Sequence, residues 1–419
     1  MKGVATAPRW DSASIIADHK FNEPPPPQKL LLGSWLPYKQ KTRWPYPASP
    51  LLHGAPKNMS SSTHRRQFLK TAAIAAACAP AIITAKRSAA QDVIGSGEYQ
   101  YRCEHMFPQL PAPFTWQITH NVAVDPDNRL YVIHEGDSKL ADHPSIFVFD
   151  SEGTFIRAFG QQFQGGGHGL EIRVEDGTPF LYVSGYQQVK SIAKMTLEGE
   201  LIWQSYAPMA SGVYAKGEAS NPARIWGRDR FMPTNFAFTP DGGFLVADGY
   251  GAFYVHRYDA NGKWVSCFGG EGDGKGKFNT PHGIWIDSRD GGDEAIVVAD
   301  RANNALQFFT MDGQYQKTVP GFGLPANIDT NGQLMLVPEL VARVSLLDRH
   351  HNTVATIGDD RERVLADKEK SKGFTIRTDE SRWEQGKFVH PHDACFDRDD
   401  NIYVAEWVST GRVSKLTRV

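Results

Sequence analysis

A short pattern recurs about six times from residue 98 onward, and this repeat limits the possible folds more than any other feature. The clearest copies start at His120 (His-Asn-Val-Ala-Val-Asp), Pro281 (Pro-His-Gly-Ile-Trp-Ile-Asp) and Pro391 (Pro-His-Asp-Ala-Cys-Phe-Asp). Weaker copies start at His168, Thr234 and Ala326. Each copy continues through polar turns into further short runs rich in Val, Leu and Tyr, which predicts several antiparallel strands per copy.

Four short strands in a repeat of roughly 40 to 50 residues are typical of one blade of a β-propeller. We therefore expect an all-β fold, a six-bladed β-propeller over residues 98–419. The last copy has room for three strands, so we expect Glu98–Cys103 to add the fourth and close the ring without an open edge. Residues 361–384 are dense in charge and are expected to form a solvated insertion.

The charge balance argues against a nucleic-acid partner. Lys and Arg total 45, Asp and Glu total 47, and the formal net charge is -2. Proteins that bind nucleic acids normally carry a basic stripe or a high pI, whereas this chain has a pI of about 6.7.

Residues 1–58 contain the run Pro24–Pro27 and no strand or helix period, so we expect a disordered or mis-annotated extension. Residues 59–90 contain Arg65-Arg66-Gln67-Phe68-Leu69-Lys70, an alanine-rich stretch and small residues at Ser88-Ala89-Ala90. This order predicts a twin-arginine signal peptide, hence a periplasmic or extracellular protein with no transmembrane segment after cleavage. The odd set of cysteines beyond it (Cys103, Cys267 and Cys395) does not predict a disulfide framework.

His168, His282 and His392 occupy the same position in copies two, four and six. The innermost strand of each blade lines the central channel, and alternate blades of a six-fold ring differ by about 120 degrees, so three imidazoles would converge. A lone histidine would more simply bond a neighbouring blade, but three in register favour a zinc site with an open position. His120 shares the position and is either a fourth ligand or a supporting partner; the alternation favours the supporting role.

The loops after the second strands share the face of the channel on which the histidines converge. Tyr250 and Arg301 lie in these loops and could reach a ligand on the metal. Asp248 and Asp300 end Val-Ala-Asp triplets, and we expect them to bond turn backbone.

These motifs resemble NHL-repeat propellers and, among them, the peptidyl-α-hydroxyglycine α-amidating lyases (peptidylamidoglycolate lyases). The resemblance covers roughly residues 115–419. It implies zinc held by His168, His282 and His392, and catalytic roles for Tyr250 and Arg301. It also implies a structural calcium held by Asp393 and by the backbone carbonyls of Val122 and Leu170.

The chain departs from this family at three positions. Glu135 stands where the family has a substrate-holding arginine, Gly251 where it has a disulfide cysteine, and His390 where it has methionine. Glu135 would repel a substrate carboxylate, which leaves the identity of the substrate open.

The resemblance favours an enzyme: an exported zinc-dependent lyase that cleaves a carbinolamide carbon–nitrogen bond in a peptide or small-molecule substrate. The alternative is a non-catalytic propeller that binds a protein or glycan outside the cytoplasm. A calcium-dependent lactonase ranks last, because it would require Glu, Asn and Asp rather than three histidines at the channel mouths.

Overall fold

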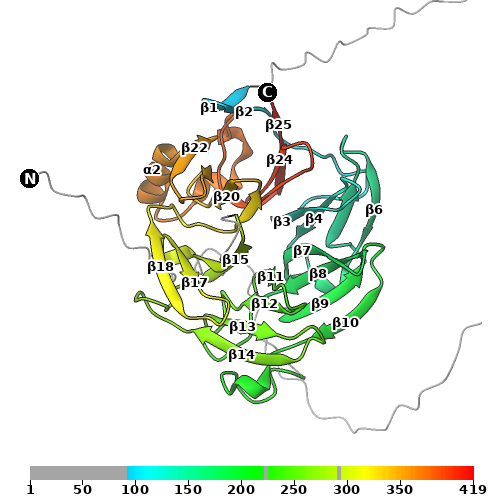
Figure 1. The fold of residues 1–419 in the computed structure, drawn as a ribbon. Helices are drawn as coiled ribbons and strands as arrows, with labels where there is room; N and C mark the ends of the chain where they lie inside the picture. The colour runs from blue at the N-terminus through cyan, green and yellow to red at the C-terminus, as the bar shows by residue number, and fades with distance from the viewer. Residues whose placement is uncertain (1–91, 141, 221–224, 290–293) are drawn as a thin grey trace, which may run out of the picture. The chain divides into compact units, whose positions relative to one another are not determined.

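The computed structural model describes residues 92–140, 142–220, 225–289 and 294–419. Six antiparallel sheets follow one another around a ring (Figure 1), so the prediction of an all-β, six-bladed propeller is confirmed. The predictions for residues 1–58 and 59–90 concern segments outside the described residues. Within the described part of the chain, no helix has the length and apolarity needed to cross a bilayer.

Five sheets have four strands each, ordered along the chain from one edge of the sheet to the other. The first two sheets contain β3 (Thr119–Val124), β4 (Leu130–His134), β5 (Ile146–Phe149) and β6 (Phe155–Phe159), then β7 (Gly167–Glu175), β8 (Thr178–Gly185), β9 (Ser191–Thr196) and β10 (Leu201–Ser205). The next two contain β11 (Phe236–Phe238), β12 (Phe244–Ala247), β13 (Tyr254–Tyr258) and β14 (Trp264–Gly269), then β15 (Pro281–Asp287), β16 (Ala295–Asp300), β17 (Ala305–Phe309) and β18 (Tyr315–Pro320). The fifth contains β19 (Asp329–Asn331), β20 (Leu334–Glu339), β21 (Arg343–Leu347) and β22 (Thr353–Ile357).

The sixth sheet joins the two ends of the propeller. Its strands β23 (Pro391–Phe396), β24 (Ile402–Glu406) and β25 (Arg412–Arg418) continue into β2 (Tyr99–Glu104) and β1 (Val93–Ser96). β2 pairs with β25 in antiparallel register, with Cys103 opposite Leu416. The predicted closure by an N-terminal strand is therefore confirmed, and β1 adds an outer fifth strand that the repeat pattern did not predict.

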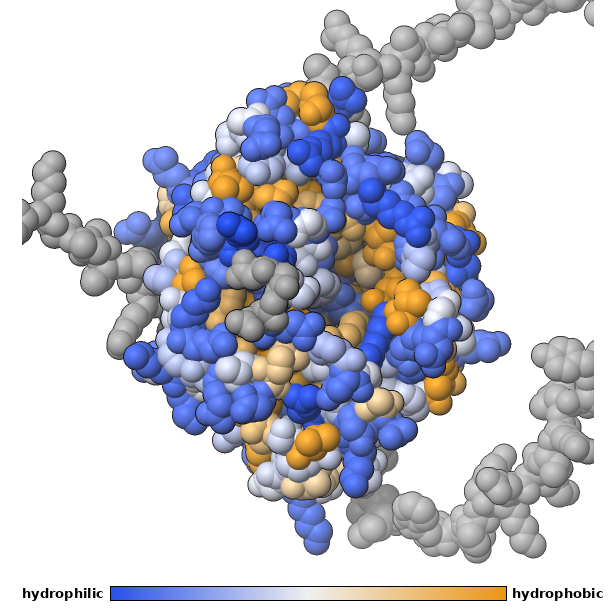
Figure 2. Space-filling view, in the orientation of Figure 1, coloured by the Kyte–Doolittle hydropathy of each residue, from blue (hydrophilic) through white to orange (hydrophobic). Residues whose placement is uncertain are grey.

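The core lies between neighbouring blades. The second strands β4 and β12 are buried along their whole length, whereas the outermost strands β10 and β18 are largely exposed or half-buried. Several apolar clusters join adjacent sheets, as where Ile133 of β4 lies in one cluster with Val183 of β8. Figure 2 shows one face of the molecular surface, which is mostly hydrophilic and has apolar residues in scattered groups.

The charged insertion before β23 is packed rather than merely solvated. It forms α2 (Arg361–Ser371), η5 (Thr375–Thr378) and η6 (Glu380–Arg382). Val364, Phe374 and Ile376 are buried in one apolar cluster with Trp407. Because charged residues dominate this segment, the sequence did not reveal that its apolar residues pack it against the propeller.

Candidate metal centre

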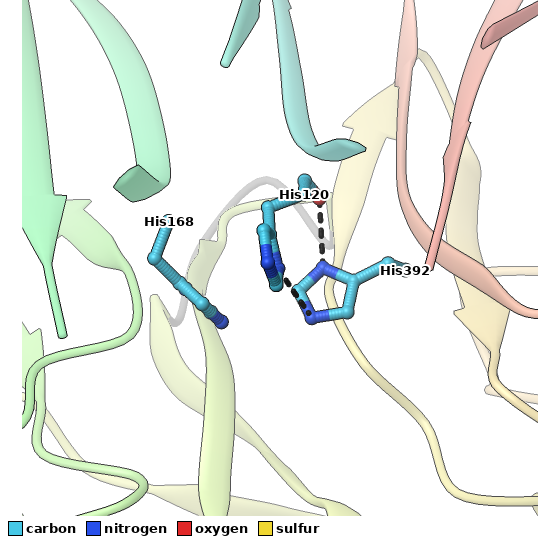
Figure 3. Close-up of side chains that lie close together, drawn as sticks. All are labelled: His120, His168 and His392. Carbon is cyan, nitrogen blue, oxygen red and sulfur yellow. Dashed lines mark hydrogen bonds between the residues drawn. The ribbon is translucent and has the colours of Figure 1, made fainter. Parts of the chain in front are cut away.

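Four buried histidines converge in the channel. They are His120 on β3, His168 on β7, His282 on β15 and His392 on β23, and none is more than 2% exposed. Neighbouring ring centroids are 4.6 to 5.0 Å apart. One ring nitrogen from each of His120, His168 and His392 lies within 4.8 Å of the others (Figure 3), so this group could hold a metal ion.

The strands that carry the histidines share a local irregularity. In all four, the pairing register with the next strand shifts at the histidine: between Thr119 and Asn121, Gly167 and Leu170, Pro281 and Ile284, and Pro391 and Asp393. A register shift of this kind re-aims a side chain out of the regular alternation of a strand. The repeat thus places one imidazole per strand at the channel axis.

Three of the histidines are oriented by backbone carbonyls of the following blade. His168 Nδ1 lies 3.0 Å from Thr234 O, His282 Nδ1 2.6 Å from Ala326 O, and His392 Nδ1 2.7 Å from His120 O. A carbonyl only accepts, so each Nδ1 carries the proton and each Nε2 keeps its lone pair. Metal-binding histidines are commonly oriented in this way.

Glycine after the histidine allows this close approach. A Cβ at Gly169 would lie 2.1 Å from Thr234 O, the carbonyl that accepts from His168. The His-Gly pair at His168 is therefore a packing requirement of the site.

His168 Nε2 and His282 Nε2 are 3.2 Å apart. Because both are unprotonated acceptors in the neutral rings, they cannot form a hydrogen bond with each other. Burial, followed by the charge of Arg301, lowers the pKa of His282 well below its ordinary value, so a shared proton is disfavoured. Two nitrogens bound to one tetrahedral zinc at 2.0–2.1 Å would be about 3.3 Å apart, and the observed spacing fits such a pair.

His120 lies in the cluster itself rather than behind it. Its Nδ1 is 3.3 Å from His392 Nε2, and its Nε2 is 3.8 Å from Glu135 Oε2. Glu135, the residue that departs from the resembled family, thus faces a histidine at the channel mouth and also accepts a hydrogen bond from Gln187 at 3.0 Å.

Tyr250 and Arg301 both reach the histidines. The Tyr250 hydroxyl is 3.0 Å from His282 Nε2 and 3.4 Å from His168 Nε2, and Arg301 Nη1 donates to it at 3.0 Å. Arg301 is 2% exposed, and its Nε has no hydrogen-bond partner among the described residues. Burial raises the pKa of the Tyr250 phenol, and the Arg301 guanidinium opposes that shift.

A second polar layer lies below the histidines. Val122 and Asp393 line a cavity of about 140 Å³ together with Glu171, Asn327 and Asp329. Asp393 accepts hydrogen bonds from the Val122 N–H at 2.8 Å and from the Asn327 side chain. Burial raises the pKa of Asp393 to about 7 and that of Asp329 to about 6, while Leu170 is buried immediately before Glu171.

The sequence analysis named Asp393 and Val122 of this layer but overlooked Glu171 and the amides, although the amides repeat in register with the histidines. The residue after each channel-mouth position is Asn121, Gly169, Asn235, Gly283, Asn327 or Asp393. Asn235 donates to Glu171 at 2.9 Å and to the Asn327 side-chain oxygen at 2.9 Å. Reading the repeat one residue further would have identified these amides.

The loops around the centre are held in two ways. Asp248 accepts from the backbone N–H groups of Met232 and Ala252, and Asp300 from that of Asn279, which confirms the predicted turn roles. Trp226 and Tyr186 pack against Tyr250 and cover it.

The insertion also contributes a residue that the sequence analysis missed, the buried Arg377. Its guanidinium lies 3.3 Å above the Trp407 ring, and its Nε donates to Trp407 O at 3.2 Å. Its charge contributes to lowering the pKa of His120, after burial.

Comparison with known proteins relates the chain to two groups of curated sequences. It is 28% identical over 218 residues to peptidyl-glycine alpha-amidating monooxygenase B of Xenopus laevis, covering 47% of this chain and 23% of that protein. It is 27% identical to NHL repeat-containing protein 3 of Homo sapiens, over 51% of this chain and 57% of that protein. It is also 27% identical to peptidyl-alpha-hydroxyglycine alpha-amidating lyase 1 of Drosophila melanogaster, over 45% of this chain and 35% of that protein. The matches thus span less than two thirds of each relative.

No protein-family model matches the chain. Among solved structures, a streptogramin B lyase aligns with a TM-score of 0.47 at 12% identity, covering 77% of this chain and 99% of that chain. The curated matches and the ring of six sheets agree with each other. The chain is an NHL-like six-bladed β-propeller that resembles the peptidyl-α-hydroxyglycine amidating lyases.

Proposed function

We propose that this protein is an exported zinc-dependent lyase that cleaves the carbon–nitrogen bond of a carbinolamide, either an α-hydroxyglycine peptide or a related substrate. One observation carries the proposal: the Tyr250 hydroxyl lies 3.0 Å from both His282 Nε2 and Arg301 Nη1. An acid–base group and a buried cation therefore meet at the nitrogens that could hold the metal.

His168 and His392 belong to the group that could hold a metal ion, and His282 Nε2 lies 3.2 Å from His168 Nε2, a spacing that fits two ligands of one zinc ion. His168, His282 and His392 keep their Nε2 lone pairs free of protons because each Nδ1 donates to a backbone carbonyl. When bound, the metal supplies Lewis-acid polarisation of the substrate oxygen.

Tyr250 is placed to move the proton. Its phenolate would take the proton of the substrate hydroxyl, and the O–H electron pair would form the carbonyl of glyoxylate. The carbon–nitrogen bond breaks, its electron pair stays on nitrogen, and Tyr250 returns the proton to give the amide. Because Tyr250 returns the proton that it took, the phenolate is regenerated at the end of the reaction.

Arg301 would hold the substrate carboxylate. A buried guanidinium whose Nε lacks a partner among the described residues can offer a planar fork of donors to a carboxylate. Its contact with Tyr250 also favours the phenolate, since the Arg301 charge lowers the pKa of Tyr250 against the effect of burial.

The second cation would be a structural calcium in the lower cavity, held by Asp393 and the carbonyls of Val122 and Leu170. Burial of the Asp393 carboxylate supports this proposal, because a divalent cation would offset the cost of ionising it. The twin-arginine pattern supports a periplasmic or extracellular location. The proposed substrate is a peptide or small molecule, and the near-neutral charge balance supports the proposal that nucleic acid is not a partner.

The test combines metal analysis with a turnover assay. The purified wild type should contain one zinc per chain and release glyoxylate from an α-hydroxyglycine peptide, whereas His282→Ala should bind zinc more weakly and lose turnover. Stoichiometric metal without turnover on any carbinolamide would reject the lyase and favour a binding platform. Zinc-free wild type that still turns over would reject the metal centre.

A further inference from the structure

The ring of His120 lies between two groups that can only accept hydrogen bonds. His392 Nε2, 3.3 Å from His120 Nδ1, is an acceptor because His392 Nδ1 donates to the His120 carbonyl at 2.7 Å. Glu135 Oε2, 3.8 Å from His120 Nε2, belongs to a carboxylate. His120 Nε2 has no hydrogen-bond partner among the described residues.

A neutral imidazole cannot donate a hydrogen bond to both neighbours, because it carries a single N–H. An imidazolium could, but it would be a fully buried cation packed against the imidazoles of His168 and His392. A metal ion on Nδ1 removes the conflict: Nδ1 then needs no proton, and the N–H on Nε2 points toward Glu135.

We propose that His120 is a fourth nitrogen ligand, bound through Nδ1, and that Glu135 positions it. The inference rests on the metal centre of the proposed function. The nitrogen pairs His120–His392 at 3.3 Å and His168–His282 at 3.2 Å each have the spacing of two ligands on one ion, and one nitrogen each of His120, His168 and His392 lies within 4.8 Å of the others. A carboxylate behind a metal-bound imidazole fixes its tautomer and raises its basicity.

The fourth imidazole changes what the metal can do. Four nitrogens complete a tetrahedral zinc shell, so a substrate oxygen can bind only when the ion expands to five or six ligands. The site would thus favour a metal that expands readily, and imidazole also suits iron, nickel and copper. The same arrangement gives Glu135 a role at the metal, which explains an anion near the substrate site.

The ligand count can be measured on the zinc-loaded full chain by X-ray absorption spectroscopy, and zinc affinity by competition with a chelator. We expect four imidazoles in the wild type and three in His120→Ala. Glu135→Gln should keep four imidazoles but bind zinc about 10- to 100-fold more weakly. His351→Ala is the matched control: it removes an imidazole 3.2 Å from the Asp287 carboxylate and outside the channel, and should match the wild type in both measurements.

Three imidazoles in the wild type, or a zinc affinity unchanged in both His120→Ala and Glu135→Gln, would overturn this inference and leave the proposed lyase intact. Should His120→Ala not fold, the wild-type count and Glu135→Gln decide the question. A wild type that binds no zinc would overturn the metal centre and this inference together. Four imidazoles without lyase turnover would support the inference and reject only the reaction.

Discussion

Tyr250 is the residue on which the proposed chemistry depends most directly, because its hydroxyl contacts both His282 and Arg301. Tyr250→Phe should lower kcat on an α-hydroxyglycine peptide by about 10² to 10⁴, the usual contribution of a positioned acid or base, without changing metal content. Tyr258→Phe is a matched control, since the buried Tyr258 hydroxyl has no hydrogen-bond partner in the described structure. Equal turnover in both variants would rule out Tyr250 as the base.

Asp329 predicts a pH dependence of folding stability. Burial raises the pKa of Asp329 to about 6, so the folded protein retains a proton that the unfolded chain releases near pH 4. The resulting stabilisation is complete below about pH 4 and lost as the pH rises through 6, a change of about 3 kcal/mol. In urea unfolding with EDTA, the wild type should lose up to about 3 kcal/mol of stability relative to Asp329→Asn between pH 4 and pH 7, because the contributions of the buried histidines are common to both proteins and cancel.

Glu171 and Asp393 share the cavity with Asp329, and burial raises the pKa of both, so the variant should keep part of the dependence. A stability difference between the wild type and Asp329→Asn that stays constant or grows in favour of the wild type over this pH interval would contradict the assignment. Added calcium should reduce the loss in the wild type, because a bound cation favours ionised carboxylates.

At the scale of elements, the pairing of β2 with β25 closes the ring. Tyr101 of β2 is fully buried in a cluster with Leu336 and Phe388, whereas the next residue, Arg102, is exposed. Tyr101→Ala should lower the free energy of unfolding by about 3 to 5 kcal/mol, and Arg102→Ala by less than about 0.5 kcal/mol. Denaturant unfolding measures both; similar values for the two variants would mean that the closing strand is not part of the cooperative fold.

The whole propeller holds the metal centre, because the four histidines come from four different sheets. Zinc bound only by the folded ring should stabilise it by about 2.7 kcal/mol at 100 times Kd, which raises Tm by roughly 4 °C for a ring of this size. At the same zinc concentration, calorimetry should show this rise for the wild type and for His351→Ala, and a smaller rise for His282→Ala. A rise of the same size in His282→Ala would place the stabilising zinc elsewhere.

The sequence alone determined the fold class, because each repeat carries the turn residues and short apolar strands of one blade, and such units are stable only when stacked in a closed ring. It also determined which histidines share a channel position, since register within a repeat maps directly onto position in a blade.

Only the tertiary structure decided what these residues do to one another. His120 could not be assigned from the repeat, because its role depends on the 3.3 Å contact with His392 and on Glu135 of a neighbouring loop. Likewise, the docking of Arg377 onto Trp407 depends on how the insertion between β22 and β23 folds back, which no periodicity encodes. Ligand geometry and desolvation arise between blades, from residues far apart in the chain, and a local pattern contains neither.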